Sequence, residues 1–91
     1  MQHYRDDIVF RSRKAVPLTG EGEIFGKVAL RHYWSLALAK QPNLRFSVLD
    51  VFEGHQMMVI TYSNHNGVKA AETLYFDEEG RVWQAAACHA G

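Results

Sequence analysis

The chain has little cysteine, little proline and no excess of charge of either sign. Cys88 is its one cysteine, so no disulfide can form within the chain. Ten Lys and Arg residues balance ten Asp and Glu residues. A neutral chain lacks both the basic surface that binds nucleic acid and the Lys/Arg-rich face of a membrane-surface helix. We therefore expect neither nucleic acid nor a membrane as a partner.

Long apolar runs and cofactor motifs are also missing. The charged start MQHYRDD has no apolar core, which excludes a signal peptide, and no apolar stretch is long enough to span a bilayer. No glycine-rich phosphate loop follows a strand, and the five histidines lack the spacing of a metal site. We therefore expect a reduced, soluble, cytoplasmic protein without a cofactor or a metal.

Apolar residues, in contrast, are plentiful for so short a chain. Its 91 residues suffice for a single domain, 1–91, and 47% of them are hydrophobic, which is too many for a disordered chain. A domain of this length buries only about 60–65% of the surface of its unfolded chain. Either the core is rich, or a partner covers some of the apolar surface.

The first half of the sequence predicts one long helix. A short strand over residues 7–12 and a loop over residues 13–22 come first. From Gly26 onward apolar residues recur three and four positions apart, and Pro42 ends this pattern near Lys40. The apolar face of the helix consists of Leu30, Tyr33, Trp34, Ala37 and Leu38.

The second half predicts a β-meander. Asn66-Gly67 indicates a tight hairpin turn in which both residues have positive φ, and Gly80 fits the left-handed position of the turn at residues 77–80. Strands joined by tight turns are antiparallel neighbours. The four expected strands lie around residues 48–52, 57–62, 71–76 and 81–89. The expected fold is therefore α+β, with one long helix packed on a curved, mainly antiparallel sheet.

Three segments resemble motifs of one superfamily. Residues 22–34, GEIFGKVALRHYW, resemble the G-x-I-x-G-K-x-A-L-x-x-Y-W entry to the main helix of the nuclear transport factor 2-like superfamily, which includes the SnoaL-like polyketide cyclases and the ketosteroid isomerases. Residues 4–10, YRDDIVF, resemble the Y-x-D-D-V-V-F segment upstream of it, and residues 76–82, FDEEGRV, resemble the F-D-x-x-G-K-I hairpin near the C-terminus. The motifs stand in family order and cover nearly the whole chain.

The resemblance implies a cystatin-like cone, in which a curved sheet wraps around helices and leaves a cavity at its wide end. Family members usually carry one or two helices before the Y-x-D-D segment, and those helices close the cone. Here Met1 stands three residues before Tyr4, so the usual N-terminal helices are lacking: either the protein is naturally short, or its start was cut or misassigned. We expect a homodimer to cover the exposed apolar surface.

Glu72 is the first candidate for a functional carboxyl group. Period-two alternation predicts that Glu72, Leu74 and Phe76 share one strand face. The resemblance places Glu72 at a position similar to that of the oxyanion-stabilising Asp in ketosteroid isomerases. Held among apolar groups, a carboxyl has a raised pKa and can donate a hydrogen bond while neutral. The alternative is a carboxylate in water near the open end of the strand.

Two features of the isomerase site are missing from this sequence. By the resemblance, the general-base Asp falls at about Ser12, and serine has no basicity to offer there. The tyrosine that completes the oxyanion hole belongs to the first helix, which is lacking. Glu72 alone therefore does not make an isomerase site.

Asp50 is the second candidate carboxyl group. Alternation predicts that Phe46, Val48, Asp50 and Phe52 share a strand face. If Asp50 is buried among these apolar side chains, its pKa is perturbed. The alternative is that Asp50 marks the exposed end of the strand.

His89 is the histidine most indicative of a site. It is predicted to share a face with Trp83, Ala85 and Ala87, and its position is similar to that of a pocket-lining aromatic in steroid-binding relatives. A Glu72–His89 pair across the last hairpin is therefore conceivable. Cys88 alternates with His89 and faces the other side.

We expect an uncharacterised small-molecule-binding domain with an apolar cavity at the open end of the cone. Its ligand-binding candidates are Trp34, Phe46, Glu72, Leu74, Trp83 and His89. One alternative is a small lyase, isomerase or cyclase that uses Glu72, Asp50 or His89 as acid or base. Another is a dimeric interaction module without a ligand. The fold does not decide among these functions.

The outer sheet face is the expected dimer surface. If Glu72 and His89 face inward, small residues and one aromatic ring lie on the opposite face, which suits a flat interface. The resemblance also implies sheet-to-sheet dimers. The expected surface consists of Thr73, Tyr75, Gln84, Ala86 and Cys88.

Overall fold

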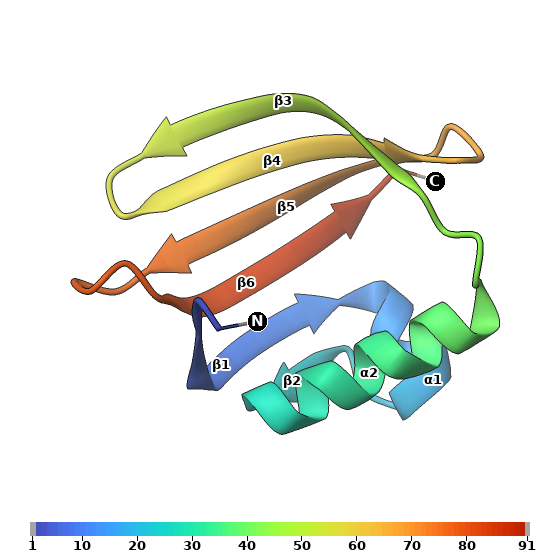
Figure 1. Cartoon of the computed structure of the whole chain (residues 1–91), viewed down its shortest axis with the longest axis horizontal. Coiled ribbons are helices and arrows are strands. Elements are labelled where there is room, and N and C mark those ends of the chain that lie inside the picture. The colour runs from blue at the N-terminus through green and yellow to red at the C-terminus, as the bar shows by residue number, and fades with distance from the viewer. Residues whose placement is uncertain (1, 91) are drawn as a thin grey trace.

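The computed structural model describes residues 2–90, and Met1, on which the question of the true start depends, lies outside them. Six strands form one sheet in the order β2-β1-β6-β5-β4-β3 (Figure 1). β1 and β6 are parallel, and every other pair of neighbours is antiparallel. The strands are β1 (Tyr4–Ser12), β2 (Glu23–Phe25), β3 (Phe46–Gly54), β4 (Met57–Asn64), β5 (Lys69–Phe76) and β6 (Val82–His89). The predicted α+β fold with a mainly antiparallel sheet is confirmed.

The predicted long helix is α2 (Lys27–Lys40). It begins directly after Gly26, whose φ of 93° favours glycine, and it ends at Gln41, which the ring of Pro42 keeps out of the helical region. Leu30 and Tyr33 are the buried residues of its apolar face, and they pack against β1.

The segment predicted as a loop after β1 is partly helical, so that prediction was wrong. It holds a 3-10 turn, η1 (Arg13–Ala15), and one turn of helix, α1 (Val16–Thr19). Pro17 suits the first turn of α1 because its missing N–H has no partner there, and Gly20 ends α1 with a left-handed φ of 84°. Helices this short carry little periodic signal in a sequence.

The β-meander over β3–β6 follows the prediction, but one turn differs. Gly80 is left-handed as predicted, with a φ of 80°. At Asn66-Gly67, only Gly67 has positive φ, so the predicted two-residue turn is wrong. The loop is longer because the Asn64 side-chain oxygen accepts hydrogen bonds from the N–H groups of Asn66, at 2.9 Å, and Val68, at 3.0 Å.

One extra residue in β3 reverses the predicted alternation. Val48 stands opposite Tyr62, but Asp50 stands opposite Thr61, so Leu49 forms a β-bulge. We call the sheet face toward α2 the inner face and the opposite face the outer face. The bulge leaves Val48 on the inner face and moves Asp50 to the outer face. The prediction that Asp50 shares a face with Phe46 and Val48 was therefore wrong.

An irregularity in β6 likewise breaks the predicted alternation of side chains at Trp83. Val82 pairs with Phe76 and Gln84 pairs with Tyr75, so Trp83 is the extra residue. Its ring lies beside that of Tyr75, with the centroids 6.0 Å apart, and the side chain is partly exposed. The prediction that Trp83 shares a face with His89 was wrong.

The core lies between α2 and the β1–β6 part of the sheet. Ile8 of β1 and Leu30 of α2 are fully buried, and Phe10, Leu74 and Ala85 pack around them. The opposite end of the sheet is different, because all nine residues of β3 are exposed. The core therefore supports only half of the sheet.

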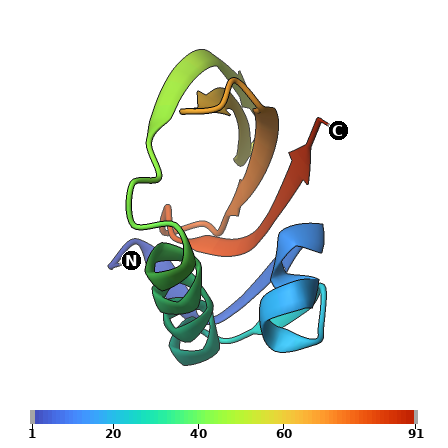
Figure 2. The same cartoon turned by 90° about the vertical axis from the view of Figure 1, so that its right-hand side faces the viewer.

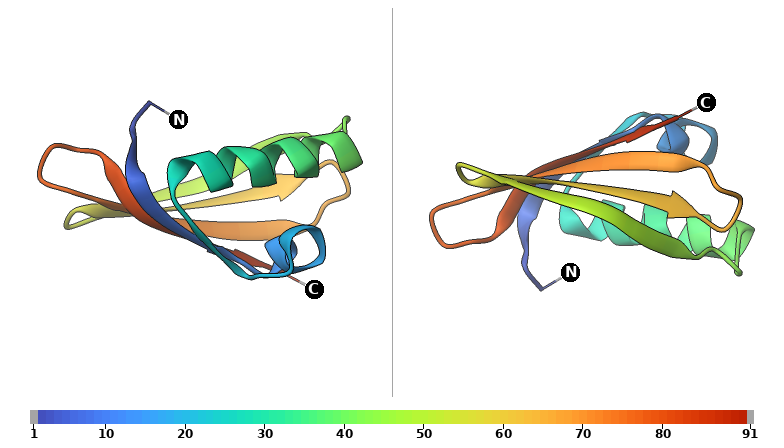
Figure 3. Two further views of the ribbon diagram at one scale, coloured as in Figure 1. Left: turned by 90° about the horizontal axis from the view of Figure 1, so that it is seen from below. Right: turned by 90° about the horizontal axis from the view of Figure 1, so that it is seen from above.

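The sheet is strongly curved. Figure 2 shows β3 and β4 arching away from β6 and back toward the end of α2, and Figure 3 shows both helices on the same face of the sheet. Within residues 2–90, no helix is long and apolar enough to cross a membrane.

Candidate functional site

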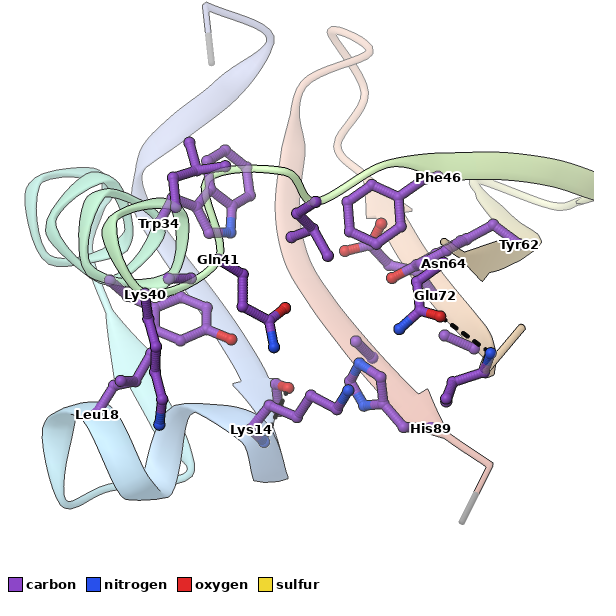
Figure 4. Close-up of a pocket in the computed structure, with 18 of the residues that line it drawn as sticks. Lys14, Leu18, Trp34, Lys40, Gln41, Phe46, Tyr62, Asn64, Glu72 and His89 are labelled. Atoms are coloured by element: carbon purple, nitrogen blue, oxygen red, sulfur yellow. Dashed lines mark hydrogen bonds between the residues drawn. The ribbon is translucent and has the colours of Figure 1, made fainter. Parts of the chain in front are cut away.

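A cleft of about 630 Å³ lies between α2 and the inner face of the curved sheet. Its walls come from η1, α1, α2, the segment that leads into β3, and strands β1, β3, β4, β5 and β6. A volume of this size lies in the range of about 300–1,000 Å³ that is typical of sites for small organic molecules. Figure 4 looks into the cleft.

The structure brings four of the predicted site residues to this cleft: Trp34, Phe46, Glu72 and His89 all line it. Leu74 does not, because it is buried in the core two residues further along β5. Asp50 and Trp83 lie outside the cleft because of the two irregularities in their strands.

Aromatic side chains form much of the cleft wall. The rings of Phe46 and Tyr62 meet edge to face across the β3–β4 pair, with centroids 5.0 Å apart. On the helix side, Trp34 meets Tyr4 in the same way at 6.0 Å. Figure 4 shows Trp34 and Phe46 on opposite sides of the opening. A flat, apolar molecule would therefore meet aromatic surface on both sides.

Glu72 is half-buried in the middle of β5 and faces the cleft. Burial raises the pKa of its carboxyl group, because the charged form loses solvation there. Among residues 2–90, no ion pair or side-chain hydrogen bond offsets this loss of solvation. Glu72 therefore retains unused hydrogen-bonding capacity toward the cleft.

Three tyrosines lie close enough to Glu72 for its charge to help raise their pKa values, and sequence reasoning gave none of them a role at the site. Burial, followed by the nearby Glu72 charge, raises the pKa of Tyr4 and of Tyr62 to about 12. Burial also raises the pKa of Tyr33, and a hydrogen bond with Ser12 opposes this shift. The alternation of β4 could have found Tyr62, because it shares the inner face with Ile60.

His89 occupies the end of the cleft near the last residues of β6. The backbone carbonyl of His89 accepts a hydrogen bond of 3.2 Å from the Arg13 guanidinium. The imidazole Nδ1 of His89 is buried and has no hydrogen-bond partner. Within residues 2–90, no other buried side-chain nitrogen or oxygen lacks a partner. Burial lowers the pKa of the imidazole, and the positive charges of Lys14 and Arg13 lower it further.

Polar side chains that the sequence did not single out also reach the cleft. Figure 4 shows Lys14 pointing toward the His89 ring, with Gln41 and Asn64 nearby and Lys40 on the helix side. Lys14 belongs to η1. Ser12 caps the start of η1, because its side-chain oxygen accepts a hydrogen bond of 3.2 Å from the backbone N–H of Lys14. No sequence motif marks Lys14, because its place depends on the turn η1, which the sequence did not predict.

The arrangement offers acid–base chemistry but no evident metal centre. Glu72 and His89 line the same cleft, and both have perturbed pKa values, which is common at functional sites. In the part of the chain that the structure describes, no three His, Cys, Asp or Glu side chains gather as a metal site would require.

Solved structures of other proteins share this fold. A SnoaL-like protein of unknown function from Burkholderia thailandensis is 32% identical, with a TM-score of 0.89 over 99% of this chain and 77% of that chain. A protein of the SnoaL-like family from Agrobacterium tumefaciens is 17% identical, with a TM-score of 0.79 over 99% and 76% of the two chains. TerC, co-crystallised with polyporic acid, is 9% identical, with a TM-score of 0.79 over 97% and 74%. No family model and no curated protein matches the chain.

Proposed function

Because the chain belongs to the SnoaL-like family, within the nuclear transport factor 2-like superfamily, we propose that it binds one small, mainly apolar organic molecule in the cleft between α2 and the sheet. The observation that carries this proposal is the position of Glu72. Its carboxyl group is half-buried in an aromatic cleft and has no partner among residues 2–90 that offsets its lost solvation.

The balance of polar and apolar groups supports this proposal. Small-molecule sites are typically lined by apolar and aromatic side chains, with a few polar groups that orient the ligand. Trp34, Phe46 and Tyr62 would supply the apolar contacts. Glu72 and His89 would supply polar contacts at two separate points. A ligand that hydrogen-bonds to Glu72 would compensate its desolvation, which favours occupancy.

The shared fold is a second, weaker support. TerC has the same fold and was co-crystallised with polyporic acid. That observation concerns TerC, and at 9% identity it supports the suitability of the fold for a ligand, not the identity of the ligand.

The two tryptophans allow a direct test by NMR. The indole N–H of Trp34 reports on the cleft, and that of Trp83, on the outer face, is a built-in control. We expect 2-acetonaphthone, a neutral bicyclic ketone, to shift the Trp34 signal in a saturable way and to leave the Trp83 signal in place. The variants Trp34→Phe and Trp83→Phe assign the two signals. Binding that moves neither signal, or both in parallel, would overturn the proposal.

Acid–base catalysis in the same cleft is the second candidate function. The raised pKa of Glu72 favours it, because a carboxyl that holds its proton closer to neutral pH can act as a general acid. Asp50 is no longer a candidate for this role, since it lies on the outer face. A catalyst would lose turnover in Glu72→Gln while keeping its affinity for the ligand. A binding protein would show no turnover in either form.

We also propose that the chain forms a homodimer. This keeps the dimer of the alternative given above, a dimeric interaction module, but combines it with ligand binding. Thr73, Tyr75 and Ala86 lie on the outer face and are only partly exposed. At the sheet edge and outside the cleft, Leu49, Val51 and Phe52 of β3 are all about half exposed. Sedimentation at micromolar concentration should give a dimer that Ala86→Arg dissociates, and a well-folded wild-type monomer would refute this proposal.

A further inference from the structure

We propose that the ligand is a small acid whose anionic group binds between Lys14 and His89, at the end of the cleft away from Glu72. This inference rests on the proposed function and specifies the chemical class of the ligand. The ligand has an aromatic or alicyclic body, which the aromatic walls hold, and a single carboxylate at one end.

The distribution of charge in the cleft is the first argument. Several other cations form ion pairs outside the cleft: Arg5 with Asp7, Arg11 with Glu23, and Lys27 with Asp6. Lys14 and Lys40 line the cleft, and no carboxylate among residues 2–90 pairs with either. Glu72 is the sole carboxylate among the residues that line it. The cleft therefore has two lysine ammonium groups whose positive charges are not neutralised by a carboxylate among residues 2–90.

The unpartnered nitrogen of His89 is the second argument. A buried polar atom without a hydrogen bond costs free energy, so a bound group that supplies this bond gains affinity. Figure 4 shows the Lys14 side chain pointing toward the imidazole, both residues line the cleft, and the positive charge of Lys14 helps to lower the pKa of His89. One carboxylate has two oxygens, so it can accept from the Lys14 ammonium and, once the atoms that cover His89 Nδ1 move aside, from the N–H of the tautomer that is protonated there.

The position of Glu72 decides which end of the ligand is anionic. Ala87 stands opposite Glu72, and His89 lies two residues further along β6, so the two are diagonal neighbours about 7–8 Å apart. A ligand anion beside Glu72 would meet a group of the same charge and no cation. A neutral edge of the ligand, such as a carbonyl or hydroxyl, suits that position. A bicyclic molecule is long enough to reach both points.

The test compares two probes of nearly the same shape, 2-naphthoate and the neutral 2-acetonaphthone. Both are titrated into the wild-type chain, with the Trp34 indole N–H as the reporter. We expect 2-naphthoate to bind about tenfold more tightly, the size of one additional charge-assisted contact. In Lys14→Gln this preference should disappear while the affinity for the ketone stays within about twofold. Lys27→Gln, a matched lysine change outside the cleft, should keep the preference.

The outcomes separate the two proposals. If neither probe binds, the proposed function fails and this inference fails with it. If the ketone binds as tightly as the naphthoate, or if Lys14→Gln keeps the preference for the naphthoate, the inference of a ligand carboxylate at Lys14 and His89 is wrong. The proposed binding function then still stands. Because the ketone must still bind to Lys14→Gln, misfolding of that variant cannot imitate the expected result.

Discussion

Glu72 and His89 face one cleft from neighbouring antiparallel strands, with Ala87 opposite Glu72 and Ala70 opposite His89. Both cross-strand partners are alanines, so no large side chain on these strands separates the two polar groups. The two groups also respond to burial in opposite senses, since burial raises the pKa of the carboxyl and lowers that of the imidazole. Both shifts favour the neutral form of the side chain. The pKa shifts therefore show neither a cation that stabilises the charged form of Glu72 nor a carboxylate that stabilises the charged form of His89.

Glu72→Gln should stabilise the protein at neutral and alkaline pH. The raised folded-state pKa means that the folded chain binds more protons than the unfolded chain above the ordinary value of 4.5. The contribution of Glu72 to stability is thus fully present below 4.5 and is lost as the pH rises through the folded-state pKa. Glutamine stays neutral throughout and avoids this loss.

Urea unfolding of both forms at about pH 4 and about pH 8 measures this difference. The gain from Glu72→Gln should be larger at the higher pH, and a gain on the order of 1 kcal/mol would raise Tm by about 4–8 °C in a domain of this size. Glu78→Gln, in the exposed turn after β5, is the matched control for the loss of a carboxylate outside the cleft. An equal effect of Glu72→Gln at both pH values would contradict the burial of its carboxyl group.

His89 should titrate below the ordinary histidine value of 6.5. Burial is the first cause of the lowered pKa and the charge of Lys14 the second, so Lys14→Gln should move the pKa of His89 upward. Because the folded-state pKa is lowered, the unfolded chain binds more protons, and stability falls as the pH drops below 6.5. An NMR titration of the imidazole protons measures both effects. An unchanged His89 pKa in Lys14→Gln would place the ammonium away from the ring.

Leu30→Ala should be severely destabilising. Leu30 is fully buried between α2 and the sheet, so the change leaves a cavity and should cost about 2–5 kcal/mol. Val28, on the same helix, is 82% exposed, and Val28→Ala should change stability by no more than about 0.5 kcal/mol. Urea unfolding compares the two variants. Similar costs at both positions would mean that α2 does not pack as described.

Asp77 organises the last hairpin. One of its side-chain oxygens accepts from the N–H groups of Glu79, at 2.9 Å, and Arg81, at 2.8 Å, and these bonds lower the pKa of Asp77. With a lowered pKa, its contribution to stability is present above 3.8 and is lost as the pH falls through the folded-state value. Asp77→Ala should destabilise the protein, whereas Asp77→Asn should keep much of the stability because its amide oxygen still accepts. Thermal unfolding that ranks asparagine below alanine would refute this role.

The elements that the sequence predicted well are those with a strong local signal. α2 has a continuous apolar face, a glycine before it and a proline after it. The strands of the meander alternate and are separated by turns that contain Gly67 and Gly80. The residues 13–19, in contrast, form single helical turns that depend on the Ser12 cap and on packing. Such contacts leave no periodic pattern in the sequence.

The site was predictable where the strands are regular and not where they bulge. Glu72 and Leu74 lie on the inner face of β5, which has no irregularity before Tyr75, and His89 lies beyond the bulge of β6. Leu49 and Trp83 each add one residue to their strand, and each extra residue breaks the alternation of side chains between the two sheet faces. A single inserted residue does not alter the composition of a strand, so alternation alone misplaced Asp50 and Trp83.

A crystal structure of the wild-type chain soaked with 2-naphthoate would test the central claim most directly. We predict density for the bicyclic ring in the cleft between Trp34 and Phe46, with the carboxylate in contact with Lys14 and His89. If the ring lies in the cleft but its carboxylate points toward solvent, only the proposed contact of the carboxylate with Lys14 and His89 is refuted. An empty cleft in crystals that bind the probe elsewhere would contradict the assignment of this cleft as the ligand site.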